Sequence, residues 1–206
     1  MLILRQGGLV FLANPKTASQ AIRAMLRPHA ETPAAARDRP HMNARSFARR
    51  WSGRVRADLG RDPETVAVMR DPLDRVASWF RYRQRDALRG HPNSTHGLTF
   101  ARFVEDCLSD PPPPHAAIGR QDRFLGFIDG GPPVTHVFDY ARLDLLVDFL
   151  QDRLGTQLDL AEANASPPAE TPPDLPKGLA ARFARQHRTE IALYDLVAEK
   201  GHLVTR

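Results

Sequence analysis

Residues 9–26, LVFLANPKTASQAIRAML, hold the pattern that decides the fold. The apolar run 9–13 has the length of a buried strand, and it follows the turn signal Gly7-Gly8. The polar residues 14–17 interrupt this run, and residues 18–26 then have the pattern of a helix. A strand, a polar turn and a helix in this order aim backbone N–H groups at an anion. The stretch therefore predicts an anion-binding turn at the end of a strand.

A second unit of the same kind occupies residues 65–78, TVAVMRDPLDRVAS. Residues 65–69 are too apolar for an edge strand and indicate a buried parallel one. Asp71 is suited to cap the helix that follows, with Pro72 in its first position and Asp74 in its first turn. Two such units predict an α/β fold with a central, mainly parallel sheet flanked by helices.

The remaining sequence adds elements to this centre and gives no sign of a second domain, so residues 1–206 are expected to form one domain. Helices are predicted at residues 43–59, 99–108, 143–154 and 178–199, and a strand at 134–138. Residues 165–176 hold five prolines, which predicts a loop.

Composition limits the class of protein. The chain has 29 Lys and Arg against 24 Asp and Glu, a net charge of +5, and 42% hydrophobic residues. This composition excludes a disordered or fibrous chain. Only three of the cations are lysines, and scattered arginines are typical of a solvated surface, so no dedicated nucleic-acid face is expected. An anionic small ligand fits the charge equally well, and composition alone does not decide between the two.

The sequence has the features of a cytoplasmic protein. It contains no apolar run of about 20 residues, and its first residues do not resemble a signal peptide, so no integral membrane segment is expected. The single cysteine, Cys107, cannot form an internal disulfide and is expected to act as a small hydrophobic residue on a helix. The eight histidines form no metal-binding motif, and no metal is predicted.

Two constellations of residues are suited to phosphate. In the first, Pro15, Lys16, Thr17, Ala18, Ser19 and Gln20 would offer backbone N–H groups, hydroxyls and one ammonium group. In the second, Arg70 ends a strand, and Ser78 lies two turns into the next helix. Each has an ordinary alternative, in which Lys16 is solvated in a simple turn and Arg70 only pairs with Asp74. Together they predict a ligand with two separated phosphates.

These motifs resemble those of sulfotransferases that use 3′-phosphoadenosine 5′-phosphosulfate (PAPS). Residues 10–19, VFLANPKTAS, are similar to the family's 5′-phosphosulfate loop, and residues 66–78 are similar to its 3′-phosphate strand and helix. The likeness is greatest to the carbohydrate-type and bacterial branch. It implies a P-loop-NTPase-like sulfotransferase fold, PAPS as co-substrate without a metal, and a hydroxyl or amine acceptor, which includes carbohydrates.

The resemblance also implies roles for single residues. Lys16 would stabilise the leaving oxygen, and Arg70 and Ser78 would hold the 3′-phosphate. Gln20 departs from the second hydroxyl residue of many relatives. Asn164 and Ser166 resemble late contacts to the co-substrate.

A general base is also required, and His41 matches a catalytic histidine segment in uronyl-type relatives. The alternative is that His41 only caps the helix after it, in which case Glu31 or Asp38 would serve as base. His136 and His187 are expected to be structural.

Two other functions remain open. A nucleotide kinase or other P-loop protein would need the Walker pattern, which this chain lacks. A non-catalytic module that binds nucleotide or polyanion is the other alternative.

Overall fold

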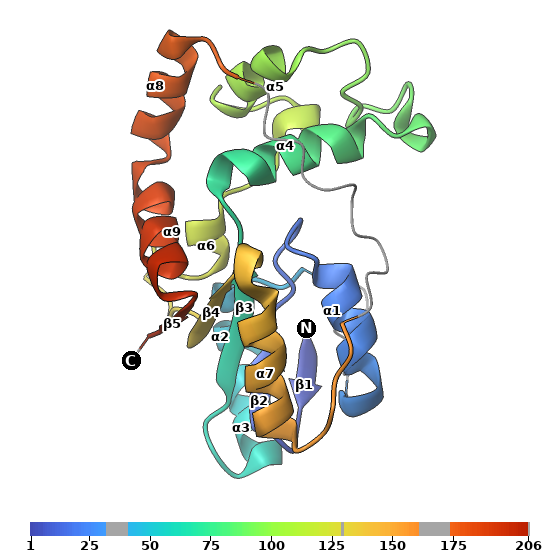
Figure 1. Cartoon of the computed structure of the whole chain (residues 1–206), viewed down its shortest axis with the longest axis vertical. Helices are drawn as coiled ribbons and strands as arrows, with labels where there is room; N and C mark the ends of the chain where they lie inside the picture. Colours follow the sequence, from blue (N-terminus) through green and yellow to red (C-terminus); the bar gives the residue numbers. More distant parts are fainter. Residues whose placement is uncertain (32–40, 129, 161–173, 206) are drawn as a thin grey trace.

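The computed structural model describes residues 1–31, 41–128, 130–160 and 174–205, and its centre is a five-stranded sheet (Figure 1). The strands lie side by side in chain order: β1 (Leu2–Leu4), β2 (Leu9–Phe11), β3 (Glu64–Met69), β4 (His136–Asp139) and β5 (His202–Val204). The three central strands are parallel, and β1 and β5 pair with them antiparallel at the two edges. The sheet is therefore mixed with a parallel centre, and the predicted α/β class is confirmed.

The central strands carry apolar residues on both sides because both faces of the sheet are covered. Val10, Ala67 and Val137 belong to the core on one face, and Phe11 and Phe138 to the core on the other. The first face is covered by α2 (Ala44–Arg50), α3 (Ser52–Leu59) and α9 (Arg188–Lys200), and the second by α1 (Ser19–Leu26) and α7 (Leu143–Leu154).

A third group of helices packs above the carboxyl ends of the parallel strands (Figure 1). It consists of α4 (Pro72–Arg83), α5 (Phe100–Cys107) and α8 (Lys177–Gln186), and the short α6 (Gln121–Phe124) leads back from it toward β4. Cys107 packs against the apolar core of this group, and burial raises the pKa of its thiol to about 12. The prediction of a small hydrophobic residue on a helix is confirmed. Short 3₁₀ turns complete the chain at Arg27–His29, Asp86–Leu88, Pro114–Ala116 and Tyr140–Arg142.

Helix boundaries follow the capping residues. The Asp71 side chain accepts the Asp74 N–H at 2.8 Å, with Pro72 in the first position of α4 as predicted. Gly155 takes a φ of 60° directly after α7 and ends it. In the described parts of the chain, no helix combines the length and apolarity that crossing a membrane requires.

Two predicted helices are each divided in the structure. The helix predicted at 43–59 is α2 and α3, because Trp51 leaves helical geometry at φ −129°. The helix predicted at 178–199 is α8 and α9, which meet at His187. The second break lets Phe183 pack in the core above the sheet while Leu193 packs on the face of the sheet. One straight helix could not reach both cores.

The edge strands β1 and β5 were not among the predicted elements. Each has only three residues, which is too short for an alternating pattern to be recognised. Of the proline-rich loop, residues 165–173 lie outside the described residues.

Candidate functional site

The two predicted phosphate motifs meet at the carboxyl edge of the sheet. Because β2 and β3 are parallel neighbours, the loop after β2 and Arg70 at the end of β3 lie at the same edge. The Arg70 guanidinium donates from Nη1 to the Lys16 carbonyl at 3.3 Å. The two motifs therefore lie at the ends of two strands of one sheet, as expected, and the structure adds that these strands are neighbours.

The loop between β2 and α1 adopts an unusual backbone conformation. Lys16 has a φ of 70° and Ala18 a φ of 54°, a region that residues with a Cβ rarely adopt. The Thr17 hydroxyl is buried and donates to the Asn14 carbonyl at 2.9 Å. Thr17 therefore shapes the turn from inside, and its hydroxyl is not exposed to a ligand as the sequence had suggested. Backbone strain of this kind is concentrated at functional sites.

The N-terminus of α1 presents donors without acceptors. No side chain caps this helix, and the N–H groups of Ala18, Ser19 and Gln20 donate to no other residue in the described ranges. Ser19 is buried and Gln20 is exposed. These N–H groups can hold an anion at the place that the sequence predicts.

Lys16 lies in a strongly positive environment. Its Nζ lies 4.4 Å from the centre of the Tyr82 ring and 5.9 Å from that of Trp79, both on α4. Burial, followed by the charges of Arg85, Arg70, Arg81 and Arg75, lowers the pKa of Lys16 to about 8. Within the described residues, no carboxylate pairs with its ammonium group. The site therefore has an excess of positive charge that an anion would neutralise.

Arg70 is buried and already has partners. Its Nε donates to Asp74 at 2.6 Å, and its guanidinium carbon lies 4.3 Å from the centre of the Tyr140 ring. The pairing with Asp74 that the sequence left open thus exists. Ser78 is also buried, and its hydroxyl bonds to no other described residue.

His41 lies beside the end of β2. Its Nδ1 is 2.8 Å from the Ala13 carbonyl oxygen. A carbonyl only accepts, so Nδ1 carries a hydrogen, and the neutral ring leaves Nε2 as an acceptor. The side chain is exposed, so Nε2 is accessible to a substrate. This tautomer is the one that a general base needs.

The other sequence candidates have different surroundings. Glu31 pairs with Arg5 at 2.9 Å beside β1, and that pairing lowers the pKa of Glu31. Glu31 is therefore held as a carboxylate by a surface cation, which makes it a weak candidate for the base. Asp38, Asn164 and Ser166 lie outside the described residues. The two histidines expected to be structural are buried or half-buried, with His136 bonded to Glu64 and His187 to Glu190.

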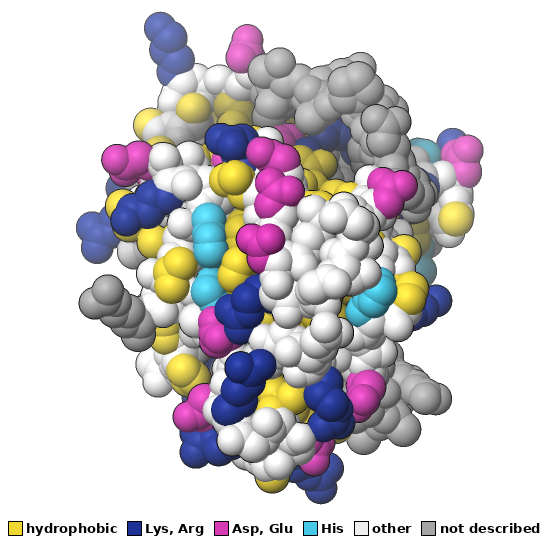
Figure 2. All heavy atoms as spheres, turned by 60° about the horizontal axis from the view of Figure 1, so that its bottom comes forward, with side chains coloured by type: hydrophobic (Ala, Val, Ile, Leu, Met, Phe, Trp, Pro, Cys, Tyr) yellow, Lys and Arg dark blue, Asp and Glu magenta, His cyan; other side chains and the backbone are white. Residues whose placement is uncertain are grey.

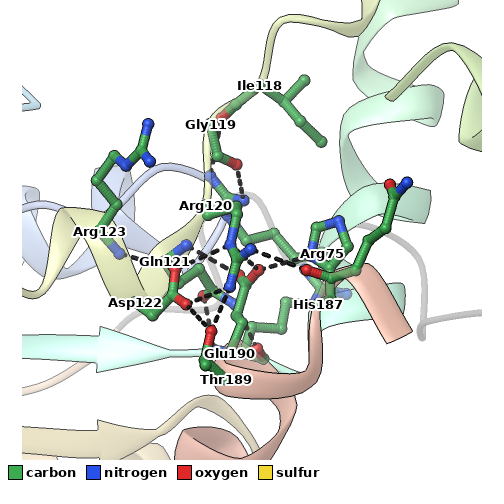
Figure 3. Close-up of polar contacts among 12 residues, drawn as sticks. Arg75, Ile118, Gly119, Arg120, Gln121, Asp122, Arg123, His187, Thr189 and Glu190 are labelled. Carbon is green, nitrogen blue, oxygen red and sulfur yellow. Dashed lines mark hydrogen bonds and ion pairs between the residues drawn. The ribbon is translucent and has the colours of Figure 1, made fainter. Parts of the chain in front are cut away.

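Sequence reasoning missed the residues that join the two strand ends. The Gln121 side chain accepts from the Arg70 N–H and from Asn14 Nδ2, both at 3.1 Å, and donates to the Arg70 carbonyl at 2.7 Å. The Gln121 N–H in turn donates to Glu190 at 2.8 Å (Figure 3). A lone glutamine on a four-residue helix gives no pattern that a sequence could reveal.

Arg75 is a second residue whose role the sequence did not reveal. It lies on α4 and is buried, and its Nε donates to the Pro15 carbonyl at 3.2 Å. Through this bond α4 holds the residue that precedes Lys16.

Elsewhere the charges are mixed. On the face drawn in Figure 2, Lys and Arg side chains alternate with Asp and Glu, so no single-sign patch forms there. Among the described residues, no three His, Cys, Asp or Glu side chains are grouped so that they could hold a metal ion. Comparison of the chain with protein-family models, with curated proteins and with solved structures finds no match.

Proposed function

We propose that this protein is a sulfotransferase that moves a sulfuryl group from PAPS to a hydroxyl or amine of a small-molecule or carbohydrate acceptor. The observation that carries the proposal is the pairing of the Lys16 loop with Arg70 at one sheet edge, where cations outnumber carboxylates. The α/β sheet is compatible with the sulfotransferase fold that the sequence motifs suggest.

The residues present fit a phosphosulfate group. The free N–H groups of Ala18 to Gln20 and the Lys16 ammonium group would surround its oxygens. Charge on the leaving phosphate oxygen grows as the sulfur–oxygen bond breaks. A lysine whose pKa is already lowered by burial and by neighbouring cations gains the most from that growing charge.

His41 would activate the acceptor. The acceptor oxygen or nitrogen forms the new bond to sulfur, and the electron pair of the broken bond stays on the 5′-phosphate. The acceptor's proton passes to His41 Nε2, while Nδ1 remains bonded to Ala13. The Ala13 carbonyl thus fixes the ring and stabilises the imidazolium that forms.

Ser78 would bind the 3′-phosphate, since its hydroxyl bonds to no other described residue, although the residue as a whole is mostly buried. Arg70 would contribute the N–H groups that Asp74 and Lys16 leave free. This arrangement would make the site bind PAPS more tightly than nucleotides that lack a 3′-phosphate.

A kinase is less well supported by the same strand ends. A magnesium-dependent kinase needs a free carboxylate there, but β3 ends in Arg70. Asp139 at the end of β4 is buried and accepts the Ala141 N–H at 3.1 Å. A module that only binds nucleotide would make the same phosphate contacts as a sulfotransferase, so a measurement of turnover must decide between these two functions.

The proposal is tested by calorimetry with adenosine 3′,5′-bisphosphate and adenosine 5′-phosphate, together with transfer of label from PAPS to a panel of acceptors. Ser78→Ala should weaken the bisphosphate about tenfold and leave the monophosphate unchanged, as expected for one hydrogen bond to a charged group. Ser52→Ala on α3, whose hydroxyl donates to Ala48, is the matched control. Equal loss for both nucleotides would remove Ser78 from the 3′-phosphate site. Tighter binding of ATP with Mg²⁺ than of the bisphosphate would favour the kinase.

A further inference from the structure

A second cavity adjoins Arg75, and it is lined by neither Lys16, Arg70 nor His41. It lies between α4, the end of α5 and the junction of α8 with α9, and its volume is about 460 Å³. This volume is within the range of small-ligand sites. None of the proposed sulfotransferase chemistry uses this cavity.

Arg75 is a buried cation without an ion-pair partner. It donates to the carbonyls of Pro15, Gly119 and Ile118 at 3.2, 3.0 and 3.2 Å. No carboxylate of the described residues lies within 4 Å of it, and burial lowers its pKa to about 10. The charge of the buried Glu190 stabilises the Arg75 cation from beyond 4 Å, and an anion that bonds to the guanidinium directly would offset more of the cost of burying it.

Arg75 also keeps donors available. A guanidinium has five N–H groups, and three of these are used, one on each nitrogen. One N–H therefore remains on each terminal nitrogen. Two such donors match the two oxygens of a carboxylate.

Two carboxylates, Glu190 and Asp110, line the cavity. Glu190 is engaged elsewhere, because it accepts from the Gln121 N–H and from His187 Nδ1, both at 2.8 Å (Figure 3). Arg120 and Arg123 are also in the wall, and Arg120 is paired with Asp122. Arg75 differs from Arg120 in that no carboxylate of the described residues lies within 4 Å of it, so a ligand can contact Arg75 without breaking a protein ion pair.

Part of the wall is apolar. It includes Pro72, Val76, Leu108 and Ala116, which can cover a hydrocarbon body. We propose that this cavity binds a small monocarboxylate with an apolar body, whose carboxylate makes a two-point contact with Arg75. The cavity lies outside the proposed transferase chemistry, although Arg75 also bonds to the Lys16 loop through Pro15.

The experiment is a methyl NMR titration with sodium phenylacetate, with phenylacetamide as the uncharged control. The methyl groups of Val76 and Leu108 should shift saturably, while those of the exposed residues Leu196 and Val204 should not. The amide should bind at least tenfold more weakly, because it lacks the charge that the guanidinium contacts. Equal binding of acid and amide would overturn the proposal.

Two variants locate the site. Arg75→Met removes the cation, and Ile118→Trp fills the cavity while keeping the carbonyl that Arg75 uses. Each should abolish the shifts, and Ile118→Trp alone decides the matter if Arg75→Met does not fold.

Saturating adenosine 3′,5′-bisphosphate should not displace the acid. Displacement by the bisphosphate or by inorganic phosphate would mean that the acid occupies the phosphate site, and the cavity proposal would be wrong. Failure of the bisphosphate to bind would count only against the transferase.

Discussion

The affinity of this protein for a phosphorylated nucleotide should fall steeply in mildly alkaline solution, because Lys16 loses its proton there. Burial and four neighbouring arginines lower its pKa to about 8. About nine-tenths of the molecules then carry the ammonium group at pH 7, and about one-tenth at pH 9. If the charged form binds, the affinity for adenosine 3′,5′-bisphosphate should fall about tenfold between these pH values.

The assay is calorimetry between pH 7 and 9.5, a range in which the phosphates are already ionised. Lys16→Arg should show almost no slope, because a guanidinium keeps its proton throughout. Lys16→Met should bind weakly with no slope. A flat profile for the parent protein, or the same slope in Lys16→Arg, would refute the assignment of Lys16.

The same lowered pKa has the opposite effect on stability. The unfolded chain holds the Lys16 proton up to about pH 10.5, whereas the folded protein releases it at about pH 8. The folded state is therefore penalised below pH 8, and the penalty disappears as the pH rises to 10.5. Lys16→Met should raise the Tm at pH 7, and the gain should shrink toward zero above pH 10. A Tm that falls at pH 7 would show that the ammonium group stabilises the fold.

Four further predictions concern other residues. His41→Ala should lower turnover by about 10²–10⁴ with unchanged bisphosphate affinity. Near-normal turnover would leave His41 only its bond to Ala13, since Asn43 and not His41 caps α2. Gln121→Leu leaves the Arg70 N–H and carbonyl without partners and should lower the free energy of unfolding by about 2–4 kcal/mol in urea titrations. A loss under about 1 kcal/mol would show that Gln121 does not hold the two strand ends together. Ala18→Gly should raise the free energy of unfolding by about 0.5–1 kcal/mol, since glycine adopts a φ of 54° without strain. A lower free energy of unfolding would contradict the left-handed conformation at Ala18. Burial and the neighbouring His136 lower the pKa of His202, so stability should fall as the pH drops below 6.5, and His202→Phe, which keeps the stacking on Phe138, should flatten that dependence.

Arg70 and His41 show which features of the candidate site could be predicted from the sequence. The order of strand, turn and helix placed Arg70 at a strand end beside the Lys16 loop, and the structure has it there. The sequence could not decide whether Arg70 pairs with Asp74, because that depends on side-chain packing. For His41, the sequence offered a candidate base, but the tautomer depends on contact with Ala13, 28 residues earlier in the chain.

The breaks at Trp51 and His187 have a similar explanation. Residues on both sides of each break favour a helix, so local propensity predicts one continuous helix. The division of the last helix follows from two separate cores, one above the sheet and one on its face, that the same segment must reach. Packing overrides propensity at such positions.

The sequence by itself determined the α/β class, the cap of α4 and the two turns that follow β2 and β3. The spacing of apolar residues, the capping residues and the turn residues that signal them all act within a few positions along the chain. Only the tertiary structure decided that Gln121 joins the two strand ends and that Arg75 lies buried between the Lys16 loop and a cavity. These bonds span 43 to 107 residues. Their partners are mostly backbone carbonyls and amides, which every residue has, so no pattern of side chains along the chain can signal them.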